Sequence, residues 1–577
     1  MAESKYLDIL QHYWGYTSFR GIQQDIIESI CSGRDTLGLM PTGGGKSICF
    51  QVPALAMEGL CIVLTPLVSL MKDQVQQLRN RNIRAAAIYS GMMRDDIICV
   101  LDNAIHGAYK LLYISPERLS SDLFRAKLVR MRKVSMIVVD EAHCISQWGY
   151  DFRPSYLQIA MLRQQFPSIP VLALTATATP QVANDIQERL AFREKNLFSM
   201  SFERKNLVYV VRETQDRAQE MLHVLQSVPQ GSAIVYTRTR QLTSDIAKYL
   251  NEQGITATNY HAGLTTAEKD LRQTNWAENR VRVMAATNAF GMGIDKPDVR
   301  VVIHFNMPDS IEAYFQEAGR AGRDGKTSYA VMLTNKQDVP HIKRRIADTY
   351  PPIEYVQKTY ENVAYFLQIG IGEGQGRTFR FSIEQFCRIF KQFPVPTLGA
   401  LQLLHNAGYI EYHEAQDIKS AIHFLGNKDE LYRIHTHDQD TEAVLQAILR
   451  TYTGVYAEYR YIEETRISQL TGLTPDHIYH ILKELHHQRV IDFIPRRHTP
   501  TITYTLPRIE THLVQLAPHI YADRKSSYEQ KINEMLAYAA STSTCRQQML
   551  LRYFGEQGQP CGQCDICLQQ RNNKKTN

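Results

Sequence analysis

The chain has 577 residues, of which 44% are hydrophobic and 21% charged, and its formal net charge is +6. These values are those of a globular protein rather than a polycation, and they permit nucleic-acid binding without requiring it. No apolar run reaches the roughly 18 residues of a membrane span, and the N-terminus lacks the pattern of a secretory signal. We therefore expect a cytoplasmic protein with roughly three to five domains and no membrane contact.

A glycine-rich turn spans residues 40–47, between an apolar strand at 35–39 and a helical stretch at 48–55. In such a turn, backbone N–H groups close on phosphate oxygens, a lysine reaches the outer phosphates, and a serine hydroxyl holds Mg²⁺. Position 40 is Met where the usual pattern has Gly, so a plain tight loop is the alternative. The predicted phosphate-binding residues are Thr42, Gly43, Gly44, Gly45, Lys46 and Ser47.

An acidic motif at residues 140–143 follows the apolar run 136–139, which reads as a buried strand. This position suits Asp140 for Mg²⁺ binding and Glu141 for orienting or deprotonating a water. With the glycine-rich turn, the motif predicts hydrolysis of a nucleoside triphosphate. The catalytic candidates are Lys46, Asp140, Glu141 and His143.

Residues 144–156 hold four aromatic side chains and an arginine directly after this motif. A base stacked on an aromatic face gains about 1–3 kcal/mol, against about 1.4 kcal/mol for one stacking step of DNA. The segment therefore suits a single strand, and a base bound here could affect Glu141. The alternative is packing in the core, which is as plausible as function for Tyr156. The predicted DNA contacts are Trp148, Phe152 and Arg153.

Apolar strands alternate with helical stretches in two consecutive series. This alternation is typical of parallel sheets covered by helices on both faces. The second series begins near residue 232, so we expect two similar α/β lobes in tandem with a boundary near residue 205. The strands are expected at 35–39, 59–64, 110–114, 136–139 and 171–174, and then at 232–236, 281–286 and 299–304.

The second lobe contains a glycine-rich segment at 316–325. It begins at Gln316 and carries Arg320 and Arg323, spaced by three. Two such arginines suit a γ-phosphate that is bound across a cleft on the first lobe. An arginine finger in that role is worth about 10³–10⁵ in rate. The alternative is a solvated arginine pair on a loop.

The segment after the second lobe contains helix–turn–helix signals. A short helix at 467–472 is followed by a helix at 477–489 with Thr474 as N-cap, and then by strands at 490–494 and 501–506. A basic stretch joins the two strands, so the pattern predicts a winged helix with a β-hairpin wing. Residues 382–412 repeat it more weakly. Both units could serve as packing modules instead; the predicted DNA contacts are Lys483, Arg496 and Arg497.

Four cysteines lie near the C-terminus, at positions 545, 561, 564 and 567. Their spacing suits a tetrahedral Zn²⁺ site, and an iron–sulfur cluster is the alternative. We expect Cys545 on a helix over 528–553 and the other three on a tight loop after Pro560. The predicted zinc ligands are Cys545, Cys561, Cys564 and Cys567.

In order along the chain, these motifs resemble those of superfamily 2 helicases, and most closely those of the RecQ family of DNA helicases. The resemblance covers about residues 1–345 and resumes at the C-terminal cysteines. Tyr150 departs from it, since RecQ proteins usually have His there. The matching stretches are 15–20 with Gln23, 41–47, 65–74, 140–156, 174–179, 260–264, 290–297 and 316–325.

The resemblance implies two RecA-like lobes and further nucleotide contacts. Tyr16 would stack on adenine, Gln23 would read it through its amide, and Arg20 would support that pocket. RecQ proteins commonly place zinc directly after the second lobe, whereas here the winged-helix signals come first. The expected domains are 1–205 and 206–345 (the lobes), 350–435 (winged-helix-like), 438–515 (winged helix) and 520–570 (zinc-binding).

By resemblance, the chain is expected to be a monomeric helicase that requires ATP, Mg²⁺ and Zn²⁺. It would move 3′→5′ on single-stranded DNA and open tailed or branched duplexes in recombination and repair, with repair proteins as further partners. An RNA helicase on the same motor is one alternative. A DNA-binding regulator whose ATPase remodels complexes without strand separation is another.

Overall fold

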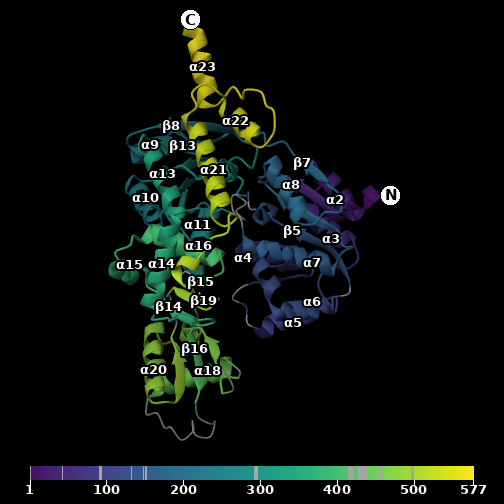
Figure 1. Ribbon diagram of the computed structural model, residues 1–577. Coiled ribbons are helices and arrows are strands. Elements are labelled where there is room, and N and C mark those ends of the chain that lie inside the picture. The colour runs from purple at the N-terminus through teal and green to yellow at the C-terminus, as the bar shows by residue number, and fades with distance from the viewer. Residues whose placement is uncertain are drawn as a thin grey trace. The chain divides into compact units, whose positions relative to one another are not determined.

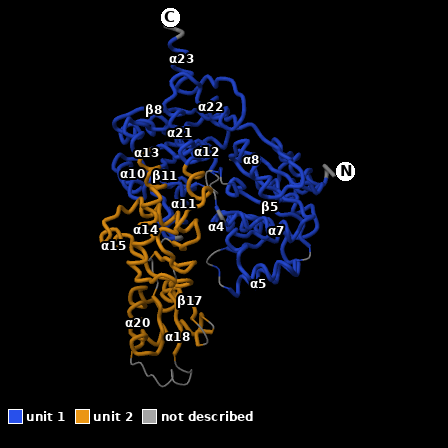
Figure 2. The backbone as a smooth tube through the Cα atoms, viewed as in Figure 1, with its two compact units in different colours: residues 1–342, 526–577 blue, residues 343–525 orange. Residues whose placement is uncertain are grey.

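The computed structural model divides into two compact units, residues 1–342 with 526–577 and residues 343–525 (Figures 1 and 2). Among the described residues, none of the helices has the length and apolarity that crossing a bilayer requires. The structure describes residues 2–41, 43–89, 92, 94–131, 133–146, 148–149, 153–291, 296–413, 420–425, 438–452, 454–456, 459–495 and 500–576.

The first lobe is built on sheet A, which has seven parallel strands. Its central strands are buried along their whole length, which is why they read as continuous apolar runs. The five strands predicted for this lobe are confirmed. In sheet order, the strands are β3 (Ala85–Ile88), β4 (Leu111–Ile114), β2 (Leu60–Leu64), β5 (Val134–Val139), β6 (Val171–Thr175), β1 (Thr36–Leu39) and β7 (Leu197–Ser199).

Helices join these strands, and most present one apolar face to the sheet. The turn at 40–47 leads into α3, as the sequence predicts. The helices of this lobe are α1 (Ala2–Trp14), α2 (Gln23–Cys31), α3 (Ile48–Ala56), α4 (Val68–Asn80), α5 (Arg94–Ile105), α6 (Asp122–Leu128), α7 (Ile159–Gln165) and α8 (Pro180–Arg189), with short 3-10 turns η1 (Pro116–Ser120), η2 (Ala142–Ile145) and η3 (Pro154–Gln158).

Strand order explains why distant motifs meet. Strands β5, β6 and β1 are consecutive neighbours in sheet A, and all three are parallel. Their carboxyl ends therefore lie at one edge of the sheet, the usual position of a ligand site in such folds. The glycine-rich turn follows β1, Asp140 follows β5, and Thr175 ends β6.

The second lobe is built on sheet B, which has six parallel strands, and the three strands predicted for it are confirmed. In sheet order they are β10 (Ala257–Tyr260), β11 (Val283–Ala286), β9 (Ser232–Tyr236), β12 (Val299–His304), β13 (Ser328–Thr334) and β8 (Leu207–Glu213). The helices that accompany them are α9 (Arg217–Ser227), α10 (Arg240–Glu252), α11 (Thr266–Ala277), α12 (Ile311–Ala318) and α13 (Asp338–Thr349).

The C-terminal segment folds back onto these lobes. It forms α21 (Ala522–Ala540), α22 (Arg546–Tyr553) and α23 (Asp565–Thr576). The ring of Phe554 stacks on Phe202 with centroids 4.6 Å apart, and the backbone N–H of Val211 in β8 donates to Asp565 at 3.1 Å. The single helix predicted over 528–553 is therefore wrong, because the chain breaks between α21 and α22 at a Ser- and Thr-rich stretch.

In the part of the second unit that the structure describes, there are two three-stranded antiparallel sheets. The helices described there are α14 (Ile353–Phe366), α15 (Ile383–Phe390), α16 (Pro394–Asn406), α18 (Gln439–Thr451), α19 (Glu464–Thr471) and α20 (Pro475–His487), with the 3-10 turn η4 (Thr511–Leu513). One sheet has the order β14 (Thr378–Arg380), β19 (Thr501–Tyr504), β15 (Ile410–His413). The other has the order β17 (Arg460–Ile462), β16 (Ser420–Phe424), β18 (Ile491–Ile494).

This topology corrects the predicted wing. The hairpin expected between 490–494 and 501–506 does not form, because β18 pairs with β16 whereas β19 pairs with β14 and β15. Separate cores follow the same division, one from 422 to 493 and the other from 356 to 410 with 502 to 514. Residues 420–494 thus lie in the chain between β15 and β19, two paired strands of the other sheet, and we call them the inserted module.

Candidate functional site

The glycine-rich turn has the backbone conformation of a phosphate cradle. Gly43 and Gly45 have φ of 85° and 76°, values that side chains disfavour. A Cβ on Gly45 would lie 2.3 Å from the amide nitrogen of Gln23, so a side chain does not fit there. The Nζ of Lys46 is buried and has no hydrogen-bond partner among the described residues. Buried polar groups are normally hydrogen-bonded, so this ammonium is suited to binding an anionic ligand.

The acidic motif lies against this turn. The Nζ of Lys46 is 4.0 Å from Glu141 Oε1, and Glu141 Oε2 is 3.4 Å from Nδ1 of His143. Glu141 has φ of 48°, in the left-handed region that is costly for a residue with a side chain. Such strain is typical of functional positions, and the strained residue is the one whose carboxylate lies 4.0 Å from the Lys46 ammonium.

Electrostatics at Asp140 favour cation binding. This side chain is buried, and burial together with the neighbouring Glu141 raises the pKa of Asp140 to about 7, while Lys46 opposes the shift. A divalent cation would stabilise the charged carboxylate and remove this penalty. The donor set of Asp140 and the Ser47 hydroxyl therefore fits Mg²⁺, which prefers oxygen ligands.

His143 and Ser47 are each held by a side chain from another element. Nδ1 of His143 lies 2.8 Å from the hydroxyl of Thr175 at the end of β6. The amide of Gln74 on α4 donates to Ser47 Oγ at 3.0 Å, and it accepts from the Tyr113 hydroxyl at 2.8 Å. No role was predicted for Gln74 from the sequence. Its position beside the buried residues Met71 and Val75 of an amphipathic helix indicates a polar side chain that faces the interior.

The residues predicted to recognise adenine lie in two environments. The Tyr16 ring is 48% exposed, and the Arg20 guanidinium lies 5.4 Å from its centroid. Gln23 is buried instead. Its amide nitrogen donates to the carbonyls of Gly44 and Gly45 at 3.2 and 3.1 Å, and its oxygen accepts from the Arg20 backbone N–H at 2.9 Å. In this structure Gln23 therefore fastens the glycine-rich turn.

The two predicted arginines are held differently. Methylenes of Arg323 lie close enough to Gly43 that a Cβ there would be 3.6 Å away, so this arginine of the second lobe reaches the glycine-rich turn. Arg320 is buried, and it donates to the Gly291 carbonyl of its own lobe. Gln316 is buried on α12, one helical turn before Arg320. Only one of the two arginines thus reaches the first lobe's turn directly.

The aromatic segment is exposed at Trp148 and buried at Tyr156. Trp148 is 38% exposed, whereas Tyr156 is fully buried and its hydroxyl donates to the Asp140 carbonyl at 3.1 Å. Tyr156 is therefore a core residue, the alternative left open by the sequence. The Arg153 side chain donates to the Pro66 carbonyl at 3.5 Å. Phe152, like Thr42, lies outside the described residues.

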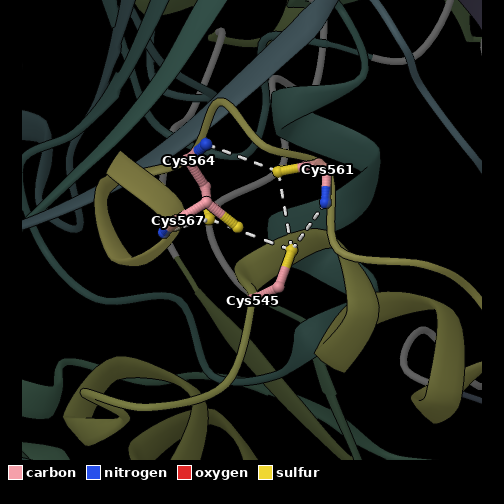
Figure 3. Close-up of side chains that lie close together, drawn as sticks. All are labelled: Cys545, Cys561, Cys564 and Cys567. Atoms are coloured by element: carbon pink, nitrogen blue, oxygen red, sulfur yellow. Dashed lines mark hydrogen bonds between the residues drawn. The ribbon is translucent and has the colours of Figure 1, made fainter. Parts of the chain in front are cut away.

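Four cysteine sulfurs converge at the C-terminus (Figure 3). All four lie within 4.8 Å of one another, and Cys545 Sγ is 3.5 Å from Cys561 Sγ and 3.9 Å from Cys564 Sγ. Tetrahedral zinc with bonds of about 2.3 Å places its sulfurs about 3.8 Å apart, so this set fits Zn²⁺. Contacts from Cys561 and Cys564 and the Cys561 N–H hold the pKa of Cys545 far below its ordinary value.

The local structure around these sulfurs differs from the prediction. Cys545 is the N-cap of α22 rather than a residue within a helix, and Cys567 lies within α23 rather than on a loop. In the second unit, Lys483 is exposed on α20, whose N-cap is Thr474 as predicted. Arg496 and Arg497 lie outside the described residues.

Family models match the chain in the order of these sites. The DEAD/DEAH box helicase model matches residues 20–186, and the helicase conserved C-terminal domain model matches 215–325. A RecQ helicase winged-helix domain model of Bacteroidota matches 422–495, which is the inserted module. The RecQ zinc-binding model matches 511–568 and includes all four cysteines.

Curated relatives agree with these models. A probable ATP-dependent DNA helicase RecS of Bacillus subtilis is 41% identical over 390 residues, which are 65% of this chain and 78% of that protein. The ATP-dependent DNA helicase RecQ of the same organism is 44% identical over 333 residues, 57% of this chain and 56% of that protein. The chain thus spans about half the length of this RecQ relative.

A solved structure supports the fold alone. Mss116p bound to ssRNA and AMP-PNP superimposes with a TM-score of 0.50 at 17% identity, covering 60% of this chain and 76% of that one. The helicase models, the RecQ-specific models and the relatives point to the same assignment. The chain belongs to the RecQ family of helicases, and it is an ATP-hydrolysing DNA helicase.

Proposed function

We propose that this helicase moves 3′→5′ on single-stranded DNA and opens tailed or branched duplexes, as in recombination and repair. The observation that carries the proposal is the reach of Arg323 to Gly43, because it joins an arginine of the second lobe to the phosphate cradle of the first. ATP bound in that cradle would draw the lobes together, and its hydrolysis would release them. Repetition of this cycle moves a strand that is held by both lobes.

The proposed roles follow the contacts. Lys46 binds the outer phosphates, Glu141 orients the attacking water, and His143 holds Glu141 through its 3.4 Å contact. Arg323 stabilises charge on the γ-phosphate. Tyr16, backed by Arg20, stacks on adenine. Mg²⁺, held by Asp140 and Ser47, would neutralise phosphate charge in the transition state.

The strand is proposed to lie on the exposed ring of Trp148. The backbone N–H of Trp148 donates to Ser146 Oγ at 3.2 Å, and Ser146 N–H donates to the His143 carbonyl at 3.2 Å. A base stacked on Trp148 is thus two hydrogen bonds from the residue that holds Glu141. We also propose lobes at 1–205 and 206–345 and a zinc-binding subdomain at 520–570.

The test is strand displacement by the full chain with ATP and Mg²⁺, from duplexes that carry either a 3′ or a 5′ single-stranded tail. We expect displacement from the 3′-tailed DNA only, and none by Lys46→Ala. Matched RNA duplexes distinguish the RNA-helicase alternative. Displacement from RNA rather than DNA, or from 5′ tails only, would contradict the proposal. DNA-stimulated ATP hydrolysis without any displaced strand would favour the remodelling regulator.

A further inference from the structure

Lys531 on α21 is a largely buried lysine that the nucleotide site does not explain. Its Nζ donates to the backbone carbonyl of Trp148 at 2.7 Å and lies 3.8 Å from Glu312 Oε1. The side chains of Lys531 and Glu312 are only 14% and 4% exposed. Burial lowers the pKa of Lys531, and the carboxylates of Glu312 and Glu534 oppose that shift. One ammonium therefore joins the C-terminal subdomain, the first lobe and the second lobe.

The contact on the first lobe is made at a tightly packed turn. Gly149 N–H donates to the Ser146 carbonyl at 3.0 Å, and a Cβ on Gly149 would lie 2.3 Å from the His143 carbonyl oxygen. The Trp148 carbonyl thus belongs to a turn that rests on the backbone of His143. A displacement of this carbonyl would therefore act on the backbone at His143, because Gly149 approaches that backbone too closely for a side chain to fit between them.

The contact on the second lobe is made on the helix that leads to the arginines. Glu312 lies in the first turn of α12, Gln316 follows one turn later, and Arg320 comes just after the helix ends. The aromatic rings of Tyr314 on α12 and Tyr538 on α21 pack with centroids 5.3 Å apart, so the two helices are in direct contact. Through α12, the position of Glu312 is tied to the segment that carries Arg323.

The chemistry of the group suits a link between two states. A buried ammonium needs its acceptors, because leaving it with an incomplete set costs about 1–3 kcal/mol or more. Trp148 supplies a carbonyl nearer the surface, and Glu312 supplies a carboxylate that is only 4% exposed and therefore hard for water to replace. If a bound strand moves the Trp148 turn, Lys531 must either move with it or lose the Trp148 carbonyl as an acceptor. Both outcomes change the interaction between Lys531 and Glu312.

We propose that Lys531 is a positioning residue that transmits strand binding at Trp148 to α12 and thereby to Arg323. The proposal rests on the proposed function, since it assumes that DNA stimulates ATP hydrolysis. The competing explanation is that Lys531 merely anchors α21 to the lobes. In that case its loss would lower stability and zinc retention and would affect all rates alike.

The experiment compares Lys531→Met, Lys531→Arg and wild type as full chains. ATP hydrolysis is measured with and without saturating single-stranded DNA, and zinc content and thermal melting are measured on the same samples. A matched control is Lys525→Met, which removes a lysine of the same helix that lies over the Tyr521 ring. Glu312→Gln provides a second, shape-conserving variant should Lys531→Met fail to fold.

For Lys531→Met we expect an unchanged basal rate and KM for ATP, full zinc content, and a DNA-stimulated kcat that falls about fivefold or more. Lys531→Arg should recover most of the stimulation, Glu312→Gln should lose it in part, and Lys525→Met should behave as wild type. Wild-type stimulation in Lys531→Met, or a parallel fall of basal rate, stimulated rate and zinc content, would overturn the proposal. A wild type that DNA does not stimulate would instead refute the proposed function.

Discussion

The nucleotide-binding unit and the inserted module place their charged groups in opposite ways. In the first unit, the side chains of Lys46, Glu141 and His143 are largely buried. Glu141 lies 4.0 Å from the Lys46 ammonium and 3.4 Å from the His143 ring. Among the described residues of the inserted module, the ion pairs are at the surface, as in His477 with Asp440, whose side chains are 50% and 47% exposed. Buried groups act strongly on a ligand because water does not screen them, whereas exposed pairs contribute little.

Net charge sharpens this contrast. Residues 420–494 contain seven Lys and Arg against eleven Asp and Glu, a formal charge of −4 in a chain whose total is +6. An acidic module repels phosphates at long range, so any DNA contact from it must be local. We therefore expect substitutions in the first unit to have large effects and those in the inserted module to have small ones.

The largest effect is expected at the metal site. Cys564→Ser removes a fully buried sulfur from the cluster of four, and structural zinc contributes roughly 10–16 kcal/mol of apparent folding free energy. We predict loss of bound zinc and unfolding of the C-terminal subdomain, measured by metal analysis and thermal melting. Cys99→Ser, at an exposed cysteine outside the cluster, is the control. Iron in place of zinc in the purified protein would favour the iron–sulfur alternative.

The next largest effect is expected at Arg323. Arg323→Ala removes the side chain that reaches the glycine-rich turn, and we predict a fall in kcat for ATP hydrolysis of about 10³-fold or more. Arg280→Ala, at a surface ion pair of the same lobe, should have no effect. A fall of less than tenfold would remove the role of Arg323 at the γ-phosphate. A larger loss in Arg320→Ala would assign that role to Arg320.

A moderate effect is expected at Trp148. Trp148→Ala should weaken single-stranded DNA binding by about 1–3 kcal/mol, the value of one stacked base, and should reduce the ratio of DNA-stimulated to basal ATP hydrolysis. Fluorescence anisotropy of a labelled oligonucleotide and steady-state kinetics measure the two quantities. Leu157→Ala is the control, because Leu157 has a similar exposed fraction of 37%. Unchanged DNA affinity would show that the strand lies elsewhere.

The smallest effect is expected at Lys483. As a single proposed phosphate contact on an acidic module, Lys483→Ala should lower DNA affinity by a few-fold and reduce the slope of log affinity against log salt by about 1. Binding measured over a series of salt concentrations gives both values. A loss as large as that of Trp148→Ala would break the contrast between the two regions. No change in slope would restrict the inserted module to packing or protein contacts.

Local patterns predicted much of the first unit. The strands that end at Val139 and Thr175 are fully buried, so their apolar runs were visible, and parallel strands gather such ends at one edge. The cysteine cluster could also be predicted, because three of its four ligands lie close together in the sequence at a spacing typical of metal sites. By contrast, the partner of Gln74 lies 27 residues away and that of Lys531 lies 383 residues away, and no local pattern encodes such contacts.

The inserted module shows a second limit. Its helices α19 and α20 were predicted with their caps, because Thr474 and Gly472 act on neighbouring residues. The pairing of β18 with β16 was not predicted. Because β18 and β19 are neighbours in the sequence, the pattern favours a hairpin between them, and only their membership of two separate cores excludes that hairpin. In a simple winged helix, the strand that pairs with β18 would come after it in the chain. Here that partner is β16, which comes before the module's helices.

ATP hydrolysis by the wild-type chain, measured as single-stranded DNA is titrated in, tests the central claim most directly. If one nucleotide is shared between the glycine-rich turn and Arg323, and the Trp148 turn senses the strand, the rate must rise with DNA and saturate. A rate that stays constant across the titration, while the same oligonucleotide is shown to bind, would contradict the account.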